Sequence, residues 1–494
     1  MMRAIKLSPE FDNLHYCMEI KKHVDDLVKP QAEQHDKILD KLLDQFETLD
    51  FEKLANPNQS ENFKLINKHY IVLAIENTFR LAEKNRWGLC KNHDFIFLYN
   101  GAYWDELDKE GFKKFLGRAA EKMGVPTFSA RYYKFRKELY EQFLGTAHLE
   151  AKQPLADKVL INLQNGTFEV SPNGTQIRPF DRRDFLTYQL PFEYDPQAKA
   201  PIFEAYLNKV LPDIERQKIL AEYLGFVFVK HGSNRLKEEK ALILYGTGAN
   251  GKSVFFEIVS ALLGSQNTSN YSLQSLTNEN GYFRAKLANK LVNYASEING
   301  KLESSVFKQL VSGEPVEARL PYGEPFTLKQ YAKLIFNCNE LPKDVEHTNA
   351  YFRRFLIIPF DITIPPQEQD KQLHSKIIEQ ELSGVFNWVL NGLNRLLEQK
   401  RFTDCEAAKL ALEQYKCESD SVKMLMEEKG YQVTADTYTK VTDLYNEYKS
   451  FCIDDGFKPV NKSNFRKRLS SYGVLIDRKN VGWIAYLSND KRPY

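Results

Sequence analysis

The sequence predicts an α/β protein of several domains, and three observations support this fold class. An apolar stretch at residues 241–245 runs directly into a glycine-rich loop and an apolar helix. Short aromatic stretches broken by Asn-Gly pairs precede it, which is typical of a mixed α+β region with hairpins. The C-terminal segment has the pattern helix, helix, strand, strand, which is the order of a winged helix.

Length and composition set the frame for this prediction. A chain of 494 residues is too long for one compact core. Hydrophobic residues make up 43% and charged residues 27%, which is ordinary globular composition. The 68 basic and 66 acidic residues give a net charge of +2, so any surface for nucleic acid must be a local one.

The pattern along the chain predicts five regions. A helical region at 1–75 is followed by a mixed α+β domain at 76–210 and by the α/β core at 211–380. A helical connector at 381–420 leads to a small C-terminal domain at 421–494. The order of these regions places the chemistry in the third one.

Two local patterns support the regions that precede the core. In the first region, Ile38, Leu42, Phe46 and Leu49 share one helical stripe, which indicates packing or oligomerisation rather than catalysis. In the second region, hairpins are expected at Asn-Gly pairs. These pairs are Asn100-Gly101, Asn165-Gly166 and Asn173-Gly174.

Cysteine usage and hydropathy exclude several classes of protein. The six cysteines are scattered with no CxxC pair, which favours reduced thiols over a zinc site or a disulfide framework. No run approaches the roughly 18 apolar residues of a membrane span, and the N-terminus has no apolar signal core. We therefore expect a cytoplasmic protein without a membrane partner.

The glycine-rich loop has the sequence GTGANGKS, the pattern of a P-loop. Its backbone N–H groups and the N-terminus of the following helix are expected to bind the phosphates of ATP. Lys252 is expected to reach the β and γ phosphates, and Ser253 to bind Mg²⁺. The expected ATP-binding residues are Gly246, Thr247, Gly248, Ala249, Asn250, Gly251, Lys252 and Ser253.

The polar residues that hydrolysis requires follow the next apolar stretches. Glu297 is the expected base and a second Mg²⁺ ligand, with Ser296 where a first acid is usual. Asn339 ends a later strand and is expected to sense the γ-phosphate. An arginine finger reaching a neighbouring subunit is expected at Arg354, with Arg353 as second choice and a surface salt bridge as the alternative.

Five stretches in this order resemble the superfamily 3 helicases, particularly the primase-helicase proteins of phages, plasmids and large DNA viruses. They are GTGANGKS, LVNYASEI, KQLVSGEPVEARLPYGEPF, KLIFNCNELP and RRFLIIPF. The resemblance covers about residues 80–380 and implies an AAA+-like P-loop core. YNGAYWDEL and INLQNGTFEV resemble the domain that precedes the motor in the same proteins.

The resemblance also implies how such a motor works. The family forms a hexameric ring around one DNA strand and moves 3′ to 5′ by ATP hydrolysis, with a hairpin from each subunit in the pore. Here that hairpin would lie within residues 319–329. Lys308, Arg319, Tyr322 and Lys329 are candidate DNA contacts, with ordinary exposed strand residues as the alternative.

Relatives often carry a primase domain, whose metal site requires closely spaced acids on a strand. No strand-borne Asp-x-Asp with an accompanying His motif precedes residue 150. We therefore expect a helicase part without a primase domain, with a separate primase and other replication proteins as partners.

Positive charge is concentrated at the C-terminus. Residues 456–494 hold nine Lys or Arg and two Asp. In the second helix of this module Phe465 and Leu469 are spaced to face a core. The candidate DNA-binding side chains are Lys462, Arg466, Lys467, Arg478 and Lys479, with Arg468 extending the patch. A solvated basic face and a protein-docking surface are the alternatives.

Together these features predict an ATP-dependent DNA helicase of phage, plasmid or mobile-element replication, acting as a homohexamer on single-stranded and forked DNA. The alternative is a nucleotide-dependent DNA-binding initiator or scaffold with little unwinding activity, which the serine at position 296 favours. A P-loop kinase or GTPase is disfavoured, because neither requires a second arginine-bearing strand and a basic winged helix.

Overall fold

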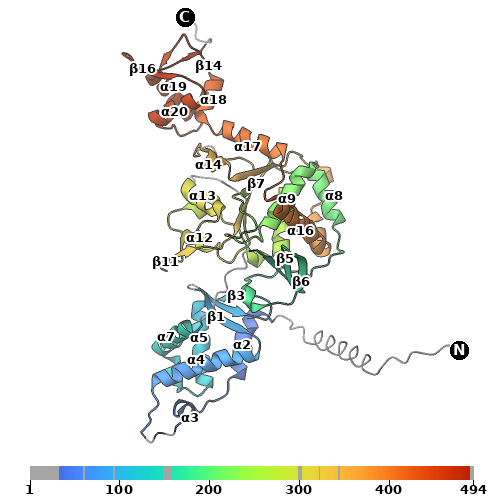
Figure 1. Cartoon of the computed structure of the whole chain (residues 1–494), viewed down its shortest axis with the longest axis vertical. Coiled ribbons are helices and arrows are strands. Elements are labelled where there is room, and N and C mark those ends of the chain that lie inside the picture. Colours follow the sequence, from blue (N-terminus) through green and yellow to red (C-terminus); the bar gives the residue numbers. More distant parts are fainter. Residues whose placement is uncertain are drawn as a thin grey trace, which may run out of the picture. The chain divides into compact units, whose positions relative to one another are not determined.

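The computed structural model describes residues 33–489 apart from the segments 59, 61, 93–94, 148–156, 297, 299–302, 322 and 343–344 (Figure 1). It divides into two compact units. The first unit comprises residues up to 154 together with 177–189, and the second comprises 155–176 and 190–494. Two candidate residues, Glu297 and Tyr322, lie outside the described part of the chain.

The first unit combines an antiparallel sheet with helices. The strands are β1 (Gly88–Asn92), β2 (Phe95–Tyr99) and β3 (Trp104–Leu107). The helices are α2 (His35–Gln45), α3 (Phe51–Ala55), α4 (Asn67–Lys84), α5 (Lys109–Lys122), α6 (Thr127–Arg131) and α7 (Tyr133–Thr146). The pair Asn100-Gly101 lies in the loop between β2 and β3, so the predicted hairpin is confirmed.

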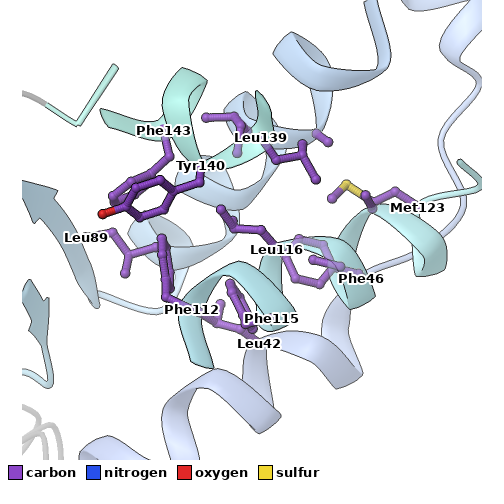
Figure 2. Packing of buried hydrophobic residues seen from close by; sticks show 14 of the residues in the cluster. Leu42, Phe46, Leu89, Phe112, Phe115, Leu116, Met123, Leu139, Tyr140 and Phe143 are labelled. Atoms are coloured by element: carbon purple, nitrogen blue, oxygen red, sulfur yellow. The ribbon is translucent and has the colours of Figure 1, made fainter. Parts of the chain in front are cut away.

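The core of the first unit contains helices that precede its sheet in the sequence and helices that follow it. Ile38 and Leu42 of α2 are buried as the predicted stripe requires, but α2 ends at Gln45, so Phe46 and Leu49 pack on the same core from beyond the helix. Figure 2 shows Leu42 and Phe46 of this stripe in the same cluster as Phe112 of α5. The boundary expected after residue 75 falls inside α4, because this helix packs into the same core.

The second unit begins with β4 (Val159–Leu163) and β5 (Gly166–Ser171), which form a sheet with β6 (Gly174–Arg178). Both Asn-Gly turns of this meander are where the sequence predicts them. Next come α8 (Pro201–Val210) and α9 (Ile214–Phe226). α8 starts at a proline, and the buried carboxylate of Glu381 accepts hydrogen bonds from the N–H groups of Ile202 and Phe203 in its first turn.

A five-stranded parallel sheet forms the centre of the second unit. Its order is β13-β7-β12-β9-β8, and each neighbouring pair is parallel. The bounds are β7 (Ala241–Tyr245), β8 (Thr268–Ser269), β9 (Val292–Ala295), β12 (Lys333–Cys338) and β13 (Phe355–Pro359). Because all five run the same way, their carboxyl ends meet at one edge, where ligands of open α/β sheets bind.

Helices and a hairpin connect these strands. The helices are α10 (Lys252–Leu263), α11 (Leu273–Thr277), α12 (Tyr282–Ala285), α13 (Ser304–Ser312) and α14 (Asn349–Phe352). The hairpin pairs β10 (Val316–Arg319) with β11 (Pro325–Leu328). Beyond β13 follow α15 (Leu373–Gln380), α16 (Leu382–Gln399) and α17 (Glu406–Glu418). Crossover helices are the usual connection between parallel strands.

The C-terminal module has the predicted order of helices and strands. After α18 (Ser421–Glu428) come α19 (Val441–Asp454), α20 (Lys462–Ser471), β16 (Ile476–Lys479) and β17 (Gly482–Ala485). Three short strands, β14 (Tyr431–Val433), β15 (Thr439–Lys440) and β18 (Leu487–Asn489), complete two small sheets. Phe465 and Leu469 are fully buried, as their spacing predicts.

Within the described ranges, five cysteines are free thiols and no cluster of histidine, cysteine and acidic side chains has the composition of a metal site. No helix in this part of the chain is long and apolar enough to cross a membrane.

Two glycines let α9 and α16 pack backbone to backbone. A Cβ at Gly392 would lie 2.4 Å from the carbonyl oxygen of Ala221, and one at Gly225 would lie 2.7 Å from Cα of Leu393. The buried carboxylate of Glu222 then binds Nε of Arg395 at 2.5 Å across the same pair of helices. The close approach therefore depends on the absence of side chains at both glycines.

We expect Gly392→Ala to destabilise the second unit by about 1–3 kcal/mol, because backbone atoms cannot yield to the added methyl group. Gly145→Ala is the matched control, since nothing lies within 4 Å of its added Cβ. In α7 that change should stabilise by about 0.5–1 kcal/mol through helix propensity. Chemical denaturation of both variants measures the difference, and equal effects of the two changes would contradict the close-packing argument.

A buried lysine begins the central strand β12. Nζ of Lys333 lies 4.1 Å from the ring centroid of Phe226 and 3.0 Å from Nδ1 of His231. Burial lowers the pKa of Lys333 to about 7. Burial and this lysine lower the pKa of His231 to about 3, so the imidazole stays neutral and accepts from Lys333.

The lowered pKa makes stability depend on pH with a definite sign. Between pH 7 and the ordinary lysine pKa of 10.5, the unfolded chain binds more protons at residue 333 than the folded chain does. Lys333 therefore makes stability rise with pH in this window, by at most about 1.4 kcal/mol per pH unit. In Lys333→Met this contribution should vanish, whereas the exposed Lys329→Met should keep it. Urea denaturation at pH 7 and 9.5 measures both slopes, and parallel slopes for wild type and Lys333→Met would refute the titration.

Candidate functional site

The loop of residues 246–253, here called the glycine loop, follows β7 at the carboxyl edge of the sheet. Its backbone has positive φ at Gly248, Ala249 and Gly251, with values of 146°, 50° and 88°. A Cβ at Gly246 would lie 2.4 Å from the carbonyl oxygen of Phe360 and 2.4 Å from Nδ2 of Asn250. Only glycine fits this first position, which explains the residue type there.

Hydrogen bonds from three directions fix the glycine loop. Gly246 N–H donates to the carbonyl of Cys338 at 3.1 Å, and Asn250 Nδ2 donates to the carbonyl of Phe360 at 3.1 Å. The hydroxyl of Tyr206, from α8, donates to the carbonyl of Gly251 at 2.8 Å. The loop is therefore held by the ends of β12 and β13 and by a helix far away in sequence.

Lys252 is the first residue of α10 and lies inside this loop. Its Nζ donates to the carbonyl of Gly246 at 2.6 Å and to Oδ1 of Asn250 at 3.1 Å. The side chain is buried, and burial lowers the pKa of Lys252. Among the described residues no carboxylate pairs with this ammonium group, so an anion bound here would relieve its desolvation. The N-terminus of α10 adds positive potential at the same point.

A cavity of about 660 Å³ opens over the glycine loop. This volume lies within the range of small-molecule sites in proteins. Gly248 to Val254 form its floor, and Ser296, Asn337 and Asn339 line it at the ends of β9 and β12. The loop, the lysine and the strand-end polar residues therefore share one cavity.

Two segments that the sequence did not indicate form the other walls. Ile202, Ala205, Tyr206 and Lys209 project from α8, and residues between 364 and 373 lie opposite. Nζ of Lys209 binds the carboxylate of Glu368 at 2.8 Å between these two walls. In the sequence α8 shows only the pattern of an amphipathic helix, so nothing local marks it as part of a site.

The strand-end residues are placed as follows. Asn339 and Ser296 are exposed and line the cavity. Asn337, which the sequence analysis missed, is buried and lines the cavity as well, and its Oδ1 accepts from the hydroxyl of Tyr294 at 3.0 Å. Strand alternation was the available signal, because residues two apart in a strand face the same side.

The two adjacent arginines differ in their surroundings. Arg354 is buried, and its Nε and Nη2 donate to Oγ of Ser312 at 3.2 and 2.8 Å. The side chain of Arg353 is 56% exposed and binds the carboxylate of Glu239 at 3.0 Å. Nη2 of Arg354 lies 3.4 Å from the same carboxylate. Of the pair, Arg353 is therefore the arginine that faces outward.

Two protein families and a viral protein match parts of this chain. The family described as "D5 N terminal like" matches residues 64–212. A family of unknown function, DUF5906, matches residues 244–354, which contain the glycine loop and both arginines. The protein described as "Putative helicase L207/L206" from Acanthamoeba polyphaga mimivirus is 27% identical over 211 residues, which are 41% of this chain and 22% of the viral protein. Residues 64–212 of the chain are therefore similar to the D5 N-terminal-like family, and the chain is similar in part to a viral protein described as a putative helicase. The chain spans 22% of the length of this viral relative.

Solved structures match the chain over a larger part of its length. An apo structure of the NrS-1 C-terminal region has 13% identity and a TM-score of 0.45, covering 82% of this chain and 97% of the other. A second apo structure of that region, residues 305–718, has 12% identity and the same TM-score, covering 84% and 99% of the two chains.

The predicted hairpin is present as β10 and β11. Arg319 ends β10, and its Nη2 donates to the hydroxyl of Tyr282 at 3.0 Å. Lys329 follows β11 and is exposed. Lys308 binds the carboxylate of Glu346 at 2.9 Å, so its charge is already paired within the chain. Tyr322, at the turn, lies outside the described residues.

The basic residues of the C-terminal module also separate into two groups. Arg466 lies over the exposed ring of Trp483 at 4.3 Å, and Lys479 lies over Tyr438 at 4.7 Å. Lys467 and Arg478 are exposed. The other two candidate residues, Lys462 and Arg468, make polar contacts within the module. Nζ of Lys462 donates to the hydroxyl of Thr442 at 3.0 Å.

Arg468 does not extend the basic patch as expected. Its Nη1 binds the buried carboxylate of Asp420 at 3.3 Å, at the junction between α17 and α18. The same carboxylate caps the first turn of α18 through the N–H groups of Val422 and Lys423. Arg468 therefore stabilises the start of the module.

We expect Gly246→Ala to weaken binding of a fluorescent ATP analogue by at least about tenfold, because the loop must move away from Phe360 to admit the methyl group. Gly248→Ala is the control, since it also has positive φ but meets nothing within 4 Å. The difference between the two variants in a fluorescence titration isolates the contact with Phe360. Equal losses in both would show that backbone strain alone matters.

Proposed function

We propose that the chain is an ATP-dependent DNA helicase that acts in phage, plasmid or mobile-element replication. One observation carries this proposal. Lys252 lies at the floor of a cavity of about 660 Å³ that Ser296, Asn337 and Asn339 also line. A P-loop and strand-end polar groups in one cavity are the arrangement that nucleotide hydrolysis requires. The parallel sheet is, in this proposal, an AAA+-like core.

The residues of the glycine loop fit the triphosphate of ATP. Nζ of Lys252 would exchange the carbonyl of Gly246 for oxygens of the β and γ phosphates, and the loop N–H groups would bind the others. Ser253 lines the cavity next to Lys252 and would hold Mg²⁺, with Glu297 as a further ligand and as the base. The bound Mg²⁺ supplies positive charge that neutralises the phosphates.

Two asparagines that line the cavity would read the γ-phosphate and the attacking water. Asn339 is exposed to the cavity and keeps the role that the sequence assigns to it. Asn337 has its amide oriented by Tyr294, so its nitrogen is the group that would donate toward the cavity. A buried, hydrogen-bonded amide beside an exposed one would couple the γ-phosphate to the end of β12.

The geometry favours Arg353 over Arg354 as the arginine finger. A finger must leave its own subunit to reach the γ-phosphate of the next one in a homohexameric ring. Arg353 is exposed and pairs only at the surface, where an ion pair is worth about 0–1 kcal/mol and exchanges easily. Arg354 would instead position it, because both arginines share the carboxylate of Glu239.

DNA would be bound by the hairpin and by the C-terminal module. Arg319 and Lys329 flank the hairpin that would face a single strand in the pore, and the motor would move 3′ to 5′ along it. The C-terminal module, in this proposal, is a winged helix. Arg466 and Lys479 lie over aromatic rings at its surface, which suits contacts with phosphates and bases of forked DNA. A separate primase would act beside it.

A second function is favoured by one specific observation. Ser296 stands at the end of β9 where a metal-binding acid is usual, and it lines the cavity. A weaker metal site would slow hydrolysis while leaving nucleotide binding intact. The chain would then be a nucleotide-dependent initiator or scaffold that binds DNA with little unwinding.

ATP turnover with and without single-stranded DNA decides between these two functions. For a helicase we expect turnover that DNA stimulates, and its loss in Lys252→Ala. We expect Arg353→Ala to lower turnover by about 10³-fold, the usual effect of removing a finger. Light scattering should still give a mass of about six subunits.

Arg354→Ala is the comparison for the finger, because it removes a buried hydrogen-bonded cation and should lower the melting temperature. Arg353→Ala should leave the melting temperature unchanged. Full turnover in Arg353→Ala would exclude it as the finger. Absence of turnover in the wild type, with DNA binding intact, would establish the initiator function instead.

A further inference from the structure

Three exposed aromatic side chains lie next to one another in the first unit. Phe128 is 92% exposed, Tyr133 is 62% exposed and Tyr132 is 49% exposed. We call these three residues the aromatic patch. Large aromatic rings are costly to leave in water, so three of them within six residues mark a binding surface. Neither the proposed ATP site nor the proposed DNA contacts involve this patch.

The fold holds the aromatic patch on a rigid corner. Tyr132 lies between the end of α6 at Arg131 and the start of α7 at Tyr133 and caps both helices. The rings of Tyr132 and Tyr133 have centroids 5.1 Å apart and meet edge to face. On either side of them Ala130 and Phe135 are buried in the core.

Further along the chain, α7 packs into the hydrophobic core of the first unit. Figure 2 shows Leu139, Tyr140 and Phe143 of α7 within the hydrophobic cluster. The backbone that carries the exposed rings is thus held by a packed core, so little backbone entropy remains to be lost when a ligand binds.

Positive charge surrounds the rings. Residues 122–137 contain five Lys or Arg and no Asp or Glu. The side chain of Lys134 is exposed and makes no hydrogen bond or ion pair with the described part of the chain. The stem of Arg136 packs on Gly117, where an added Cβ would lie 2.8 Å from its Cδ, and the residue is half-buried.

The other cations of this segment form exposed ion pairs. Arg131 binds Glu121 at 2.8 Å, Lys122 binds Asp44 at 3.3 Å and Lys137 lies 3.6 Å from Glu141. Such pairs contribute about 0–1 kcal/mol and yield to a competing phosphate. Lys134 and Arg136 provide the charge that a polyanion meets first.

We propose that the aromatic patch binds single-stranded nucleic acid, with unpaired bases stacked on Phe128 and Tyr133 and with phosphates at Lys134 and Arg136. Rings interleaved with cations are the composition of sites that bind single strands without sequence preference. Protein interfaces, by contrast, are depleted in lysine. A duplex offers few free base faces for exposed rings to stack on. The inference deepens the proposed function, because it adds a DNA contact outside the ATP-binding unit.

The test measures binding of a fluorescent oligo-dT to the full chain without nucleotide. We expect Phe128→Ala with Tyr133→Ala to weaken binding by about tenfold or more, since stacking contributes about 1–3 kcal/mol per base. Tyr133→Phe, which keeps the ring, should bind as the wild type does. Leu54→Ala, at a residue 50% exposed in the same unit, is the control for truncating an exposed side chain.

Two further readouts separate this site from a protein interface. Lys134→Ala should lower the slope of log affinity against log salt by about 0.7, the value for one phosphate contact on a single strand. Oligo-dU carrying a photoreactive base should crosslink to Phe128 or Tyr133. Unchanged oligo-dT affinity in the double variant would overturn the proposal, whether or not the subunit mass changes. If the oligo-dT affinity and the subunit mass both fall in the double variant, crosslinking of the wild type decides. A crosslink at Phe128 or Tyr133 supports the proposal, and its absence overturns it.

Failure of this inference is distinguishable from failure of the proposed function. The oligo-dT assay contains no nucleotide, so it does not depend on turnover. ATP turnover without DNA should be the same in the double variant and the wild type. A chain that binds oligo-dT through the patch but hydrolyses no ATP would retain this site and lose only the helicase function.

Discussion

The close contact between Gly246 and Phe360 sets the geometry on which the candidate site depends. The chain leaves β7 at Gly246 and passes so near the end of β13 that no side chain fits between them. Asn250 then donates to the same carbonyl of Phe360, which closes the glycine loop on itself. Because the loop is fixed to two neighbouring strands, Lys252 at the start of α10 has one position, and the strand-end residues face it across a single cavity.

Much of this core could be predicted because its determinants are local. The glycine loop, the apolar strands and the helix after the loop are each encoded in a few consecutive residues, and the structure has them where the sequence indicates. The extent of the first unit was harder to predict from the sequence. α2 and α4 share their core with α5 and α7, so a boundary at residue 75 divides a helix whose partners lie tens of residues later. A change in the residue pattern along the sequence does not show which helices and strands pack together.

The candidate site shows the same division between local and distant determinants. Asn339 was found because it ends an apolar strand, whereas α8 was missed because its contact with the loop, through Tyr206 and Gly251, joins residues 45 positions apart. Arg353 and Arg354 are indistinguishable by pattern. Their difference arises from Ser312 and Glu239, which bury one guanidinium and leave the other outside.

Counting basic residues in the sequence did not show which of them are available to bind an anion, and the reason is physical. A cation that forms an ion pair with an acid of the same chain is already neutralised, as Lys308 is by Glu346 and Arg468 is by Asp420. A cation beside an exposed ring keeps its charge available, as Arg466 does over Trp483. The aromatic patch has Lys134 next to its exposed rings in the sequence, in a segment whose cations the net charge of the whole chain conceals. Aromatic neighbours, rather than the number of basic residues, therefore indicate which surfaces of this chain are suited to a nucleic acid.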